Sequence, residues 1–246
     1  MPTFFVGSEA IASPIIRIEG PLLRHLKDSL RIQPEDALTV TDDQGHRYRT
    51  EVVTVTDRVI ESRIIETASA PARTSPSLIL AQSLLKGEKM DWVIQKATEL
   101  GVDRIVPVHA KHSVVKLHAD RVDHQRTRWQ RIALEAAQQS ERWTVPIVEE
   151  PATLPQLFSR YHACASKHIL AERSTGPSLN VVPLPVGADK SVMLLIGPEG
   201  GWDQEEFRLA GEEGYGEMTL GARILRAETA AVATISIIQA RLGELG

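Results

Sequence analysis

The segment VMLLIGPEGG, residues 192–201, is the strongest indication of the fold class, because a short apolar run leads directly into a turn with three glycines and a proline. Asp203 and Glu206 follow with the spacing of a capping box, which predicts a helix that begins here and ends near Gly214. A buried strand, a glycine-rich turn and a helix in this order indicate an α/β sheet, whose ligands bind beyond the carboxyl ends of the strands. The turn is neither a P-loop nor a Gly-x-Gly-x-x-Gly dinucleotide motif. It either offers backbone amides to a ligand or only connects a strand to a helix.

A second segment, LGARILRAETA at residues 220–230, places charged side chains directly before an apolar helix. Burying Arg223, Arg226 and Glu228 at such a place is costly unless they are paired or used for binding. The structural interpretation is a pair between Arg226 and Glu228 or between Arg223 and Glu199. The functional interpretation is that the arginines bind an anionic partner.

The pattern of apolar residues changes once along the chain, which predicts two domains. Residues 37–66 alternate like a meander of strands and, with short strands before them, predict a small β-barrel over residues 1–70. The stretch 68–77 is small, polar and proline-bearing, so we expect a linker. Residues 78–246 alternate between strands and helices, which predicts a mainly parallel sheet covered by helices. The strand-like runs are Thr3–Val6, Ile15–Ile18, Ala37–Thr41, Arg47–Val55, Val59–Glu66, Leu78–Gln82, Arg104–His109, Thr144–Val148, His168–Ala171 and Val192–Ile196. Besides the helix that begins after Asp203, the predicted helices are Leu22–Leu30, Met90–Leu100, Val122–Glu141 and Ala230–Leu242.

The composition is that of an ordinary globular protein, since 42% of the 246 residues are hydrophobic and 24% are charged. Cys164 is the only cysteine, so neither a disulfide within the chain nor a cysteine-rich zinc site can form. His109 and His112 lack supporting carboxylates, and no metal site is expected. No run approaches the roughly 20 apolar residues of a membrane span, and the N-terminus lacks the pattern of a signal peptide. We therefore expect a soluble cytoplasmic protein.

Charge is distributed unevenly, although the chain as a whole carries −4. Residues 104–142 contain eight Lys/Arg against four Asp/Glu, together with four of the eight histidines. Residues 1–70 contain eight basic and eleven acidic side chains. The basic segment is either a face that contacts nucleic-acid phosphates or a solvated helix surface.

Further motifs accompany the two segments in a fixed order. They are His25-Leu26 through Leu30-Arg31, Gln95–Gly101, Ser113–Lys116, Arg128–Arg131 and Glu135–Ser140. Together with residues 196–201 and 220–230, this set resembles the RsmE-type 16S ribosomal RNA uridine-N3 methyltransferases of the SPOUT superfamily. The resemblance covers nearly the whole chain, which makes it far more specific than GPEGG alone. Three positions depart in detail: Glu141 replaces a usual glycine, Ala227 replaces the threonine of an Arg-Thr-Glu-Thr string, and Trp202 is the aromatic residue after the glycines.

The resemblance implies an N-terminal PUA-like β-barrel, a C-terminal α/β domain with a deep trefoil knot, and a homodimer. It implies S-adenosyl-L-methionine as cofactor, bound by loops of the knot. The cofactor-binding residues implied are Leu170, Glu172, Ile196, Gly197, Pro198, Glu199, Gly200, Gly201, Leu220, Gly221, Ile224, Leu225 and Arg226. The barrel and the basic segment would grip RNA, with Arg24, Arg31, Lys111, Lys116 and Arg131 as candidate contacts.

The reaction implied is methyl transfer to N3 of a uridine in 16S ribosomal RNA, free or in the small subunit. That nitrogen carries a weakly acidic proton, so an arginine near O2 or O4 could stabilise the anion while a carboxylate or histidine accepts the proton. We expect Arg226 and Arg142 to orient the substrate or stabilise charge, and Glu199 and Glu228 to position neighbours or take the proton. The alternatives are a SPOUT methyltransferase that acts on transfer RNA or a ribose hydroxyl, and a non-catalytic RNA-binding or ribosome-assembly protein.

Overall fold

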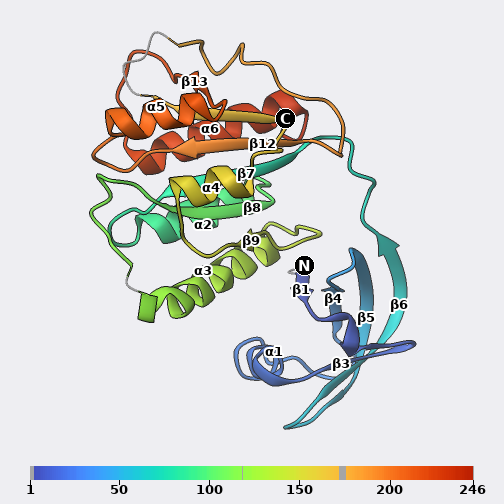
Figure 1. Cartoon of the computed structure of the whole chain (residues 1–246). Coiled ribbons are helices and arrows are strands. Elements are labelled where there is room, and N and C mark those ends of the chain that lie inside the picture. The colour runs from blue at the N-terminus through green and yellow to red at the C-terminus, as the bar shows by residue number, and fades with distance from the viewer. Residues whose placement is uncertain (1–2, 118, 172–175, 246) are drawn as a thin grey trace. The chain divides into compact units, whose positions relative to one another are not determined.

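The computed structural model describes residues 3–117, 119–171 and 176–245, and the chain divides into two compact units (Figure 1). The first unit is Met1–Ala72 with Ala137–Thr144, and the second is Arg73–Ala136 with Val145–Gly246. The sequence places its domain limits at residues 70 and 78. The structure adds a distant segment, 137–144, to the first unit.

A curled six-stranded sheet forms the first unit. Its strands, in the order in which they pair, are β1 (Thr3–Phe5), β4 (Ala37–Thr41), β5 (His46–Val55), β6 (Ile60–Ser69), β3 (Ile15–Ile18) and β2 (Ile11–Ala12). β1 pairs in parallel with β4, and the other neighbours are antiparallel. The register of β5 on β6 shifts after Arg49 and again after Val52, and such irregularities bend a long strand. The predicted helix Leu22–Leu30 is an α-helical turn, α1 (Gly20–Arg24), followed by a π turn, η2 (His25–Ser29); a 3-10 turn, η1 (Ser8–Ala10), precedes β2.

Arg47 of β5 fastens segment 137–144 to the first unit. Its guanidinium donates to the carbonyl oxygens of Glu141 and Arg142, at 2.9 Å each, and lies 4.0 Å over the ring of Trp143. Burial lowers the pKa of Arg47, opposed by the charge of Glu141. Glu141 itself has a φ of 52°, a left-handed conformation that favours glycine. This explains why a glycine suits the position.

The second unit is built on a fully parallel sheet, which confirms the predicted mixed α/β class. Its strands follow the order β10 (Ala152–Thr153), β8 (Arg104–His109), β7 (Ser77–Ser83), β12 (Ser191–Ile196), β11 (Ser166–Leu170) and β13 (Gly216–Met218), and β9 (Ile147–Val148) also pairs with β8. The helices are α2 (Lys89–Glu99), α3 (Ala119–Gln139), α4 (Leu154–Arg160), α5 (Gln204–Glu212) and α6 (Ala227–Leu242).

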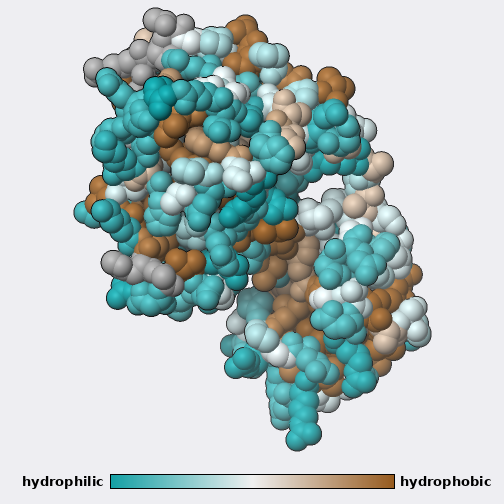
Figure 2. Space-filling model, in the orientation of Figure 1, coloured by the Kyte–Doolittle hydropathy of each residue, from teal (hydrophilic) through white to brown (hydrophobic). Residues whose placement is uncertain are grey.

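Alternate residues of each strand feed two hydrophobic cores, one on each face of this sheet. Leu78 and Leu80 of β7 join the core that contains side chains of α2, α3 and α6. Ile79 and Ala81 join the core that contains side chains of α4 and α5. In Figure 2, hydrophilic residues cover much of the visible surface of this unit, with hydrophobic ones scattered among them. Within the described residues, no helix has the length and apolar character needed to cross a membrane.

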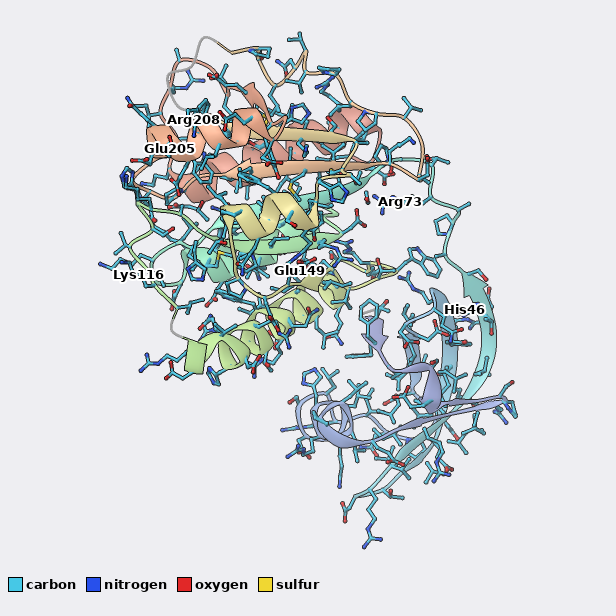
Figure 3. All side chains as sticks on the ribbon, viewed as in Figure 1. His46, Arg73, Lys116, Glu149, Glu205 and Arg208 are labelled. Carbon is cyan, nitrogen blue, oxygen red and sulfur yellow. The ribbon has the colours of Figure 1, made fainter. Side chains whose placement is uncertain are left out.

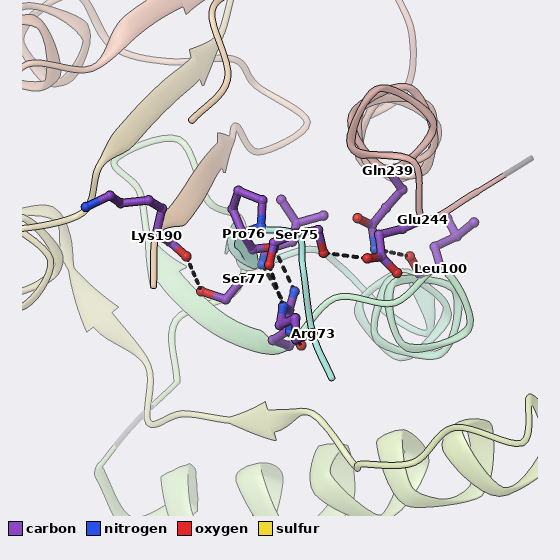
Figure 4. Close-up of polar contacts among 10 residues, drawn as sticks. Arg73, Ser75, Pro76, Ser77, Leu100, Lys190, Gln239 and Glu244 are labelled. Carbon is purple, nitrogen blue, oxygen red and sulfur yellow. Dashed lines mark hydrogen bonds and ion pairs between the residues drawn. The ribbon is translucent and has the colours of Figure 1, made fainter. Parts of the chain in front are cut away.

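The second half of the expected linker is fixed to the second unit (Figure 4). Arg73 donates to the carbonyl oxygens of Ser75 and Pro76, at 2.8 and 2.7 Å, and pairs with Asp103 at 2.7 Å. The Ser75 hydroxyl donates to Glu244 near the C-terminus. β6 includes the first two residues of the expected linker and ends at Ser69. The free stretch is therefore much shorter than the ten residues that composition suggests.

Candidate functional site

A cavity of about 650 Å³ opens at the carboxyl ends of β11, β12 and β13, a size typical of sites for small molecules. These strands are parallel neighbours, so the residues that follow each of them meet at the same edge. The cavity is lined by Leu170, Ala171, Ile196, Gly197, Pro198, Gly200, Gly201, Trp202, Asp203, Gln204, Phe207, Glu217, Thr219, Leu220, Gly221, Arg223, Ile224, Leu225, Ala227 and Ala230. The two segments singled out in the sequence thus line one cavity.

The glycine-rich turn packs closely against its surroundings. A Cβ on Gly200 would lie 2.9 Å from Cβ of His112, so no larger residue fits without movement. Gly201 has a φ of 72°. The indole of Trp202 donates to the carbonyl oxygen of Leu170 at 3.2 Å, which ties the turn after β12 to the end of β11. The turn is therefore held from two sides.

Asp203 and Glu206 form the predicted capping box at the start of α5. The same two carboxylates also bind the loop after β8. The Lys111 amide donates to Glu206 Oε1 at 2.8 Å, the Lys111 ammonium lies 2.8 Å from Asp203 Oδ2, and His112 Nδ1 donates to the Gly201 carbonyl at 3.2 Å. The hydrogen bond from Lys111 is the main cause that lowers the pKa of Asp203. Lys111, a candidate RNA contact, is thus already paired at the rim of the cavity.

Glu199 and Glu228 do not line the cavity, and both turn toward Lys89. The Lys89 Nζ atom lies 3.2 Å from Glu199 Oε1 and 3.5 Å from Glu228 Oε2. Burial opposes the shift, but hydrogen bonds from the backbone of Glu199, from Lys89 and from the Lys86 amide hold the pKa of Glu199 below its usual range. The structural interpretation was wrong about the pairs, because both carboxylates bind Lys89 rather than Arg223 or Arg226.

The remaining proposed catalytic residues lie outside the cavity lining. Arg226 is the exposed N-cap residue of α6, between the lining residues Leu225 and Ala227, and its carbonyl accepts from the Ala230 amide at 2.8 Å. Arg142 belongs to the first unit. Of the proposed cofactor residues, Glu172 lies outside the described residues.

The candidate RNA contacts are all on the surface. Arg24 and Arg31 are exposed in the first unit, on and just after the short helical turns. Lys116 is exposed on the loop between β8 and α3 (Figure 3), and Arg131 of α3 pairs with Glu135 at 3.3 Å. Among the described residues, no group of three or more histidine, cysteine or acidic side chains is placed to hold a metal ion.

Several lining residues lie outside the segments proposed from the sequence for the cofactor: Trp202, Asp203, Gln204, Phe207, Glu217 and Ala230. Asp203 is the N-cap residue of α5, and Gln204 and Phe207 belong to the first turn of this helix, which the capping box locates. Their position after the glycine-rich turn was a usable signal, because residues that follow such a turn face the same crevice. Glu217 lies on β13, a strand with no sequence signal of its own.

Comparison with known proteins assigns the family. A family model described as an RNA methyltransferase domain matches residues 73–239, and an RNA methyltransferase PUA domain matches residues 18–65. The ribosomal RNA small subunit methyltransferase E of Bacillus subtilis (strain 168) is 32% identical over 92% of this chain and 90% of its own length. The chain belongs to this methyltransferase family. The resemblance inferred from the sequence motifs is confirmed.

Other members of the family agree over similar lengths. The protein of the same name from Synechocystis sp. (strain ATCC 27184 / PCC 6803 / Kazusa) is 30% identical over 96% of this chain and 77% of its own length. A crystal structure of a ribosomal RNA small subunit methyltransferase E from Neisseria gonorrhoeae, bound to S-adenosyl methionine, is 29% identical. Its TM-score is 0.86, and the match covers 98% of both chains. This match includes both units, so the family's PUA-like and α/β parts are both present here.

Proposed function

We propose that this protein transfers the methyl group of S-adenosyl-L-methionine to N3 of a uridine in 16S ribosomal RNA. The observation that carries the proposal is the cavity between the glycine-rich turn and residues 219–225, in a chain whose relative from Neisseria gonorrhoeae binds this cofactor. The resemblance of the sequence motifs supports the choice of uridine N3. The knot, the homodimer and the cytoplasmic location implied by that resemblance belong to the same proposal.

The residues around the cavity fit the cofactor. Ile196, Leu220, Ile224 and Leu225 offer apolar contacts for a flat adenine ring, while the glycines leave backbone groups open to its polar edge. Arg223 could pair with the carboxylate of the methionine part, because its side chain lines the same cavity.

The charged lining is also suitable for a cationic ligand. Glu217 and Asp203 both line the cavity, and Asp203 is paired with Lys111. When bound, the cofactor supplies an electrophilic methyl group that reacts with a nucleophile in line. The Glu217 carboxylate would favour such a positively charged sulfonium over a neutral thioether, whereas Lys111 and Arg223 offset part of the negative charge of the lining.

The protein's part in the reaction is to place the uracil and to manage its N3 proton. Arg226 would stabilise negative charge on the base, because it is exposed and follows the lining residue Leu225. Arg142 would orient the substrate from the first unit. Glu228, two residues beyond Arg226, would accept the proton or position its neighbours.

RNA would be gripped by exposed basic side chains of both units. Arg24 and Arg31 lie in or beside the part that matches the PUA family model, and Lys116 and Arg131 lie in the second unit. Contacts to phosphates release counterions, so RNA affinity should fall as salt concentration rises. An RNA affinity that does not change with salt would contradict this part of the proposal.

The proposal is tested by incubating purified small subunits, and separately their free RNA, with methyl-labelled cofactor and mapping the modified nucleotide. We expect one N3-methyluridine in 16S RNA, and the same nucleotide should lack the methyl group in a strain without this protein. Label at a ribose, in transfer RNA or at another base would refute the substrate. Arg226→Ala should strongly reduce turnover while cofactor affinity is retained, and unchanged turnover would remove Arg226 from the mechanism.

A further inference from the structure

A single ammonium group joins three segments that are distant in the sequence. Lys89 is the first residue of α2, Glu199 lies in the glycine-rich turn, and Glu228 lies in the first turn of α6. The two Nζ–Oε distances are 3.2 and 3.5 Å. The side chains of Glu199 and Glu228 are 24% and 15% exposed, so both carboxylates are largely withdrawn from water.

Glu228 depends on Lys89 more than a surface carboxylate would. Its Oε2 atom is buried, and within the described part of the chain it accepts no hydrogen bond. The cation beside it is Lys89. A buried carboxylate that loses its compensating charge is strongly destabilised, whereas an exposed ion pair contributes little.

Glu199 is held to the same place by a second contact. The amide of Lys86, three residues before Lys89, donates to Glu199 Oε1 at 3.3 Å. The hydrogen bond to Glu199 is also the main cause that raises the pKa of Lys89, against the effect of burial. The start of α2 thus grips the glycine-rich turn through both backbone and side chain.

The two carboxylates belong to two segments that both line the cavity. Pro198 and Gly200, the chain neighbours of Glu199, are lining residues, and so is Ala227, next to Glu228. Two carboxylates near each other repel, so an ammonium between them sets the spacing of the segments that carry them. Lys89 itself is not among the lining residues.

We propose that Lys89 is a positioning residue, which holds the glycine-rich turn and the start of α6 at the spacing that the cofactor requires. This inference rests on the proposed function for the identity of the cofactor. Lys89 acts through Glu199 and Glu228 and touches neither cofactor nor RNA. The same bridge orients Arg226, since this residue is the N-cap of the helix that Glu228 anchors.

The test is calorimetric titration of the full-length protein with S-adenosyl-L-methionine. Lys89→Met removes the charge but keeps the side-chain length, and we expect the Kd to rise by about tenfold, within the usual range of coupling between contacting residues. Lys89→Arg retains the positive charge and should remain within about threefold of wild type. In turnover assays Lys89→Met should raise KM for the cofactor more than it lowers kcat.

Lys96→Met is the matched control. Lys96 lies on the same helix, is similarly exposed and pairs with Glu99 at 2.8 Å, but it is far along α2 from the residues that contact Glu199. We expect this variant to bind the cofactor like wild type. Equal losses of cofactor affinity in Lys96→Met and Lys89→Met would overturn the inference, because removal of any positive charge from α2 would then explain the loss.

A double variant covers the case in which Lys89→Met does not fold. Lys89→Met with Glu228→Gln removes the buried negative charge together with the ammonium, so it should fold but still bind the cofactor weakly. Wild-type affinity in either variant would overturn the role of Lys89. A wild-type protein that binds the cofactor but methylates no RNA would refute the proposed function and not the role of Lys89. The order of cofactor affinities among the variants would still test whether Lys89 positions the two segments.

Discussion

Replacing Gly200 by alanine tests whether close packing of the glycine-rich turn shapes the cofactor site. The added Cβ would lie 2.9 Å from Cβ of His112 and 3.4 Å from its carbonyl oxygen. Carbon atoms that are not bonded prefer a separation of about 3.5–4.0 Å. The close atom is fixed to the backbone, so rotation of the His112 side chain cannot relieve the contact. Either the turn or the loop after β8 must move.

Movement of these loops should be measurable in both stability and binding. Overpacking of this kind costs about 1–3 kcal/mol. If the loops shift only slightly and keep their contacts, the free energy of unfolding falls by that amount. If they separate, the 3.2 Å hydrogen bond between His112 and Gly201 is disturbed and cofactor affinity falls instead. We expect the two losses together to reach about 1–3 kcal/mol.

The assay is urea denaturation combined with calorimetric titration of S-adenosyl-L-methionine, and Gly211→Ala is the control. Gly211 lies in α5, and no atom would come within 4 Å of its added Cβ. Alanine in a helix should stabilise the protein by about 0.5–1 kcal/mol there. His112→Gly removes the close Cβ atom, so it should recover part of the loss caused by Gly200→Ala. Wild-type stability and affinity in Gly200→Ala would refute the reasoning.

Three further predictions follow from single contacts. The pKa of Glu199 is lowered, so the ionised carboxylate should stabilise the fold by a constant amount at neutral pH. This stabilisation should disappear as the pH falls below 4.5, the ordinary pKa of a glutamate. The difference in Tm between wild type and Glu199→Gln should therefore shrink in acid. Because Glu141 has a φ of 52°, Glu141→Gly should retain or raise the free energy of unfolding by up to about 1 kcal/mol, whereas Glu141→Val should lower it, as urea denaturation would show. The Tyr161 hydroxyl donates to Glu149, which is 11% exposed (labelled in Figure 3), so Tyr161→Phe should cost about 1 kcal/mol in the same measurement. No loss in that variant would show that Arg104 and Arg160 satisfy Glu149 by themselves.

The parts of the fold that could be predicted are those whose signals are local. The capping box at Asp203 and Glu206 needs only four consecutive residues, and the structure contains it as predicted. β10 and β13 could not be predicted in the same way, because strands of two or three residues are defined by pairing with β8 and β11. α4 was also missed, although its own capping box, Thr153 with Gln156, was a usable signal.

The sequence located the residues that line the cavity better than it predicted the charge pairs beside it. Its two main segments adjoin β12 and α6, and the order of strand, glycine-rich turn and capped helix drew attention to the first. The predicted partners of Glu199 and Glu228 were wrong, because the residue that binds both, Lys89, is more than a hundred residues away along the chain. It comes near only because β7, which precedes α2, pairs with β12, which precedes the turn. Sheet order therefore selects the partner, and sheet order was not determined by the local patterns.

The basic segment, residues 104–142, also differs between its charge counted along the chain and its charge in the folded structure. Counting along residues 104–142 gives a surplus of positive charge, yet carboxylates from outside the segment cancel much of it. The pairs are Arg104 with Glu149, Lys111 with Asp203, Arg126 with Glu150 and Arg128 with Asp91. In the described part of the chain, Arg24, Arg31 and Lys116 have no such pair. Since salt-dependent RNA affinity reflects the phosphates that are actually neutralised, these three side chains should matter more for RNA binding than the charge of α3.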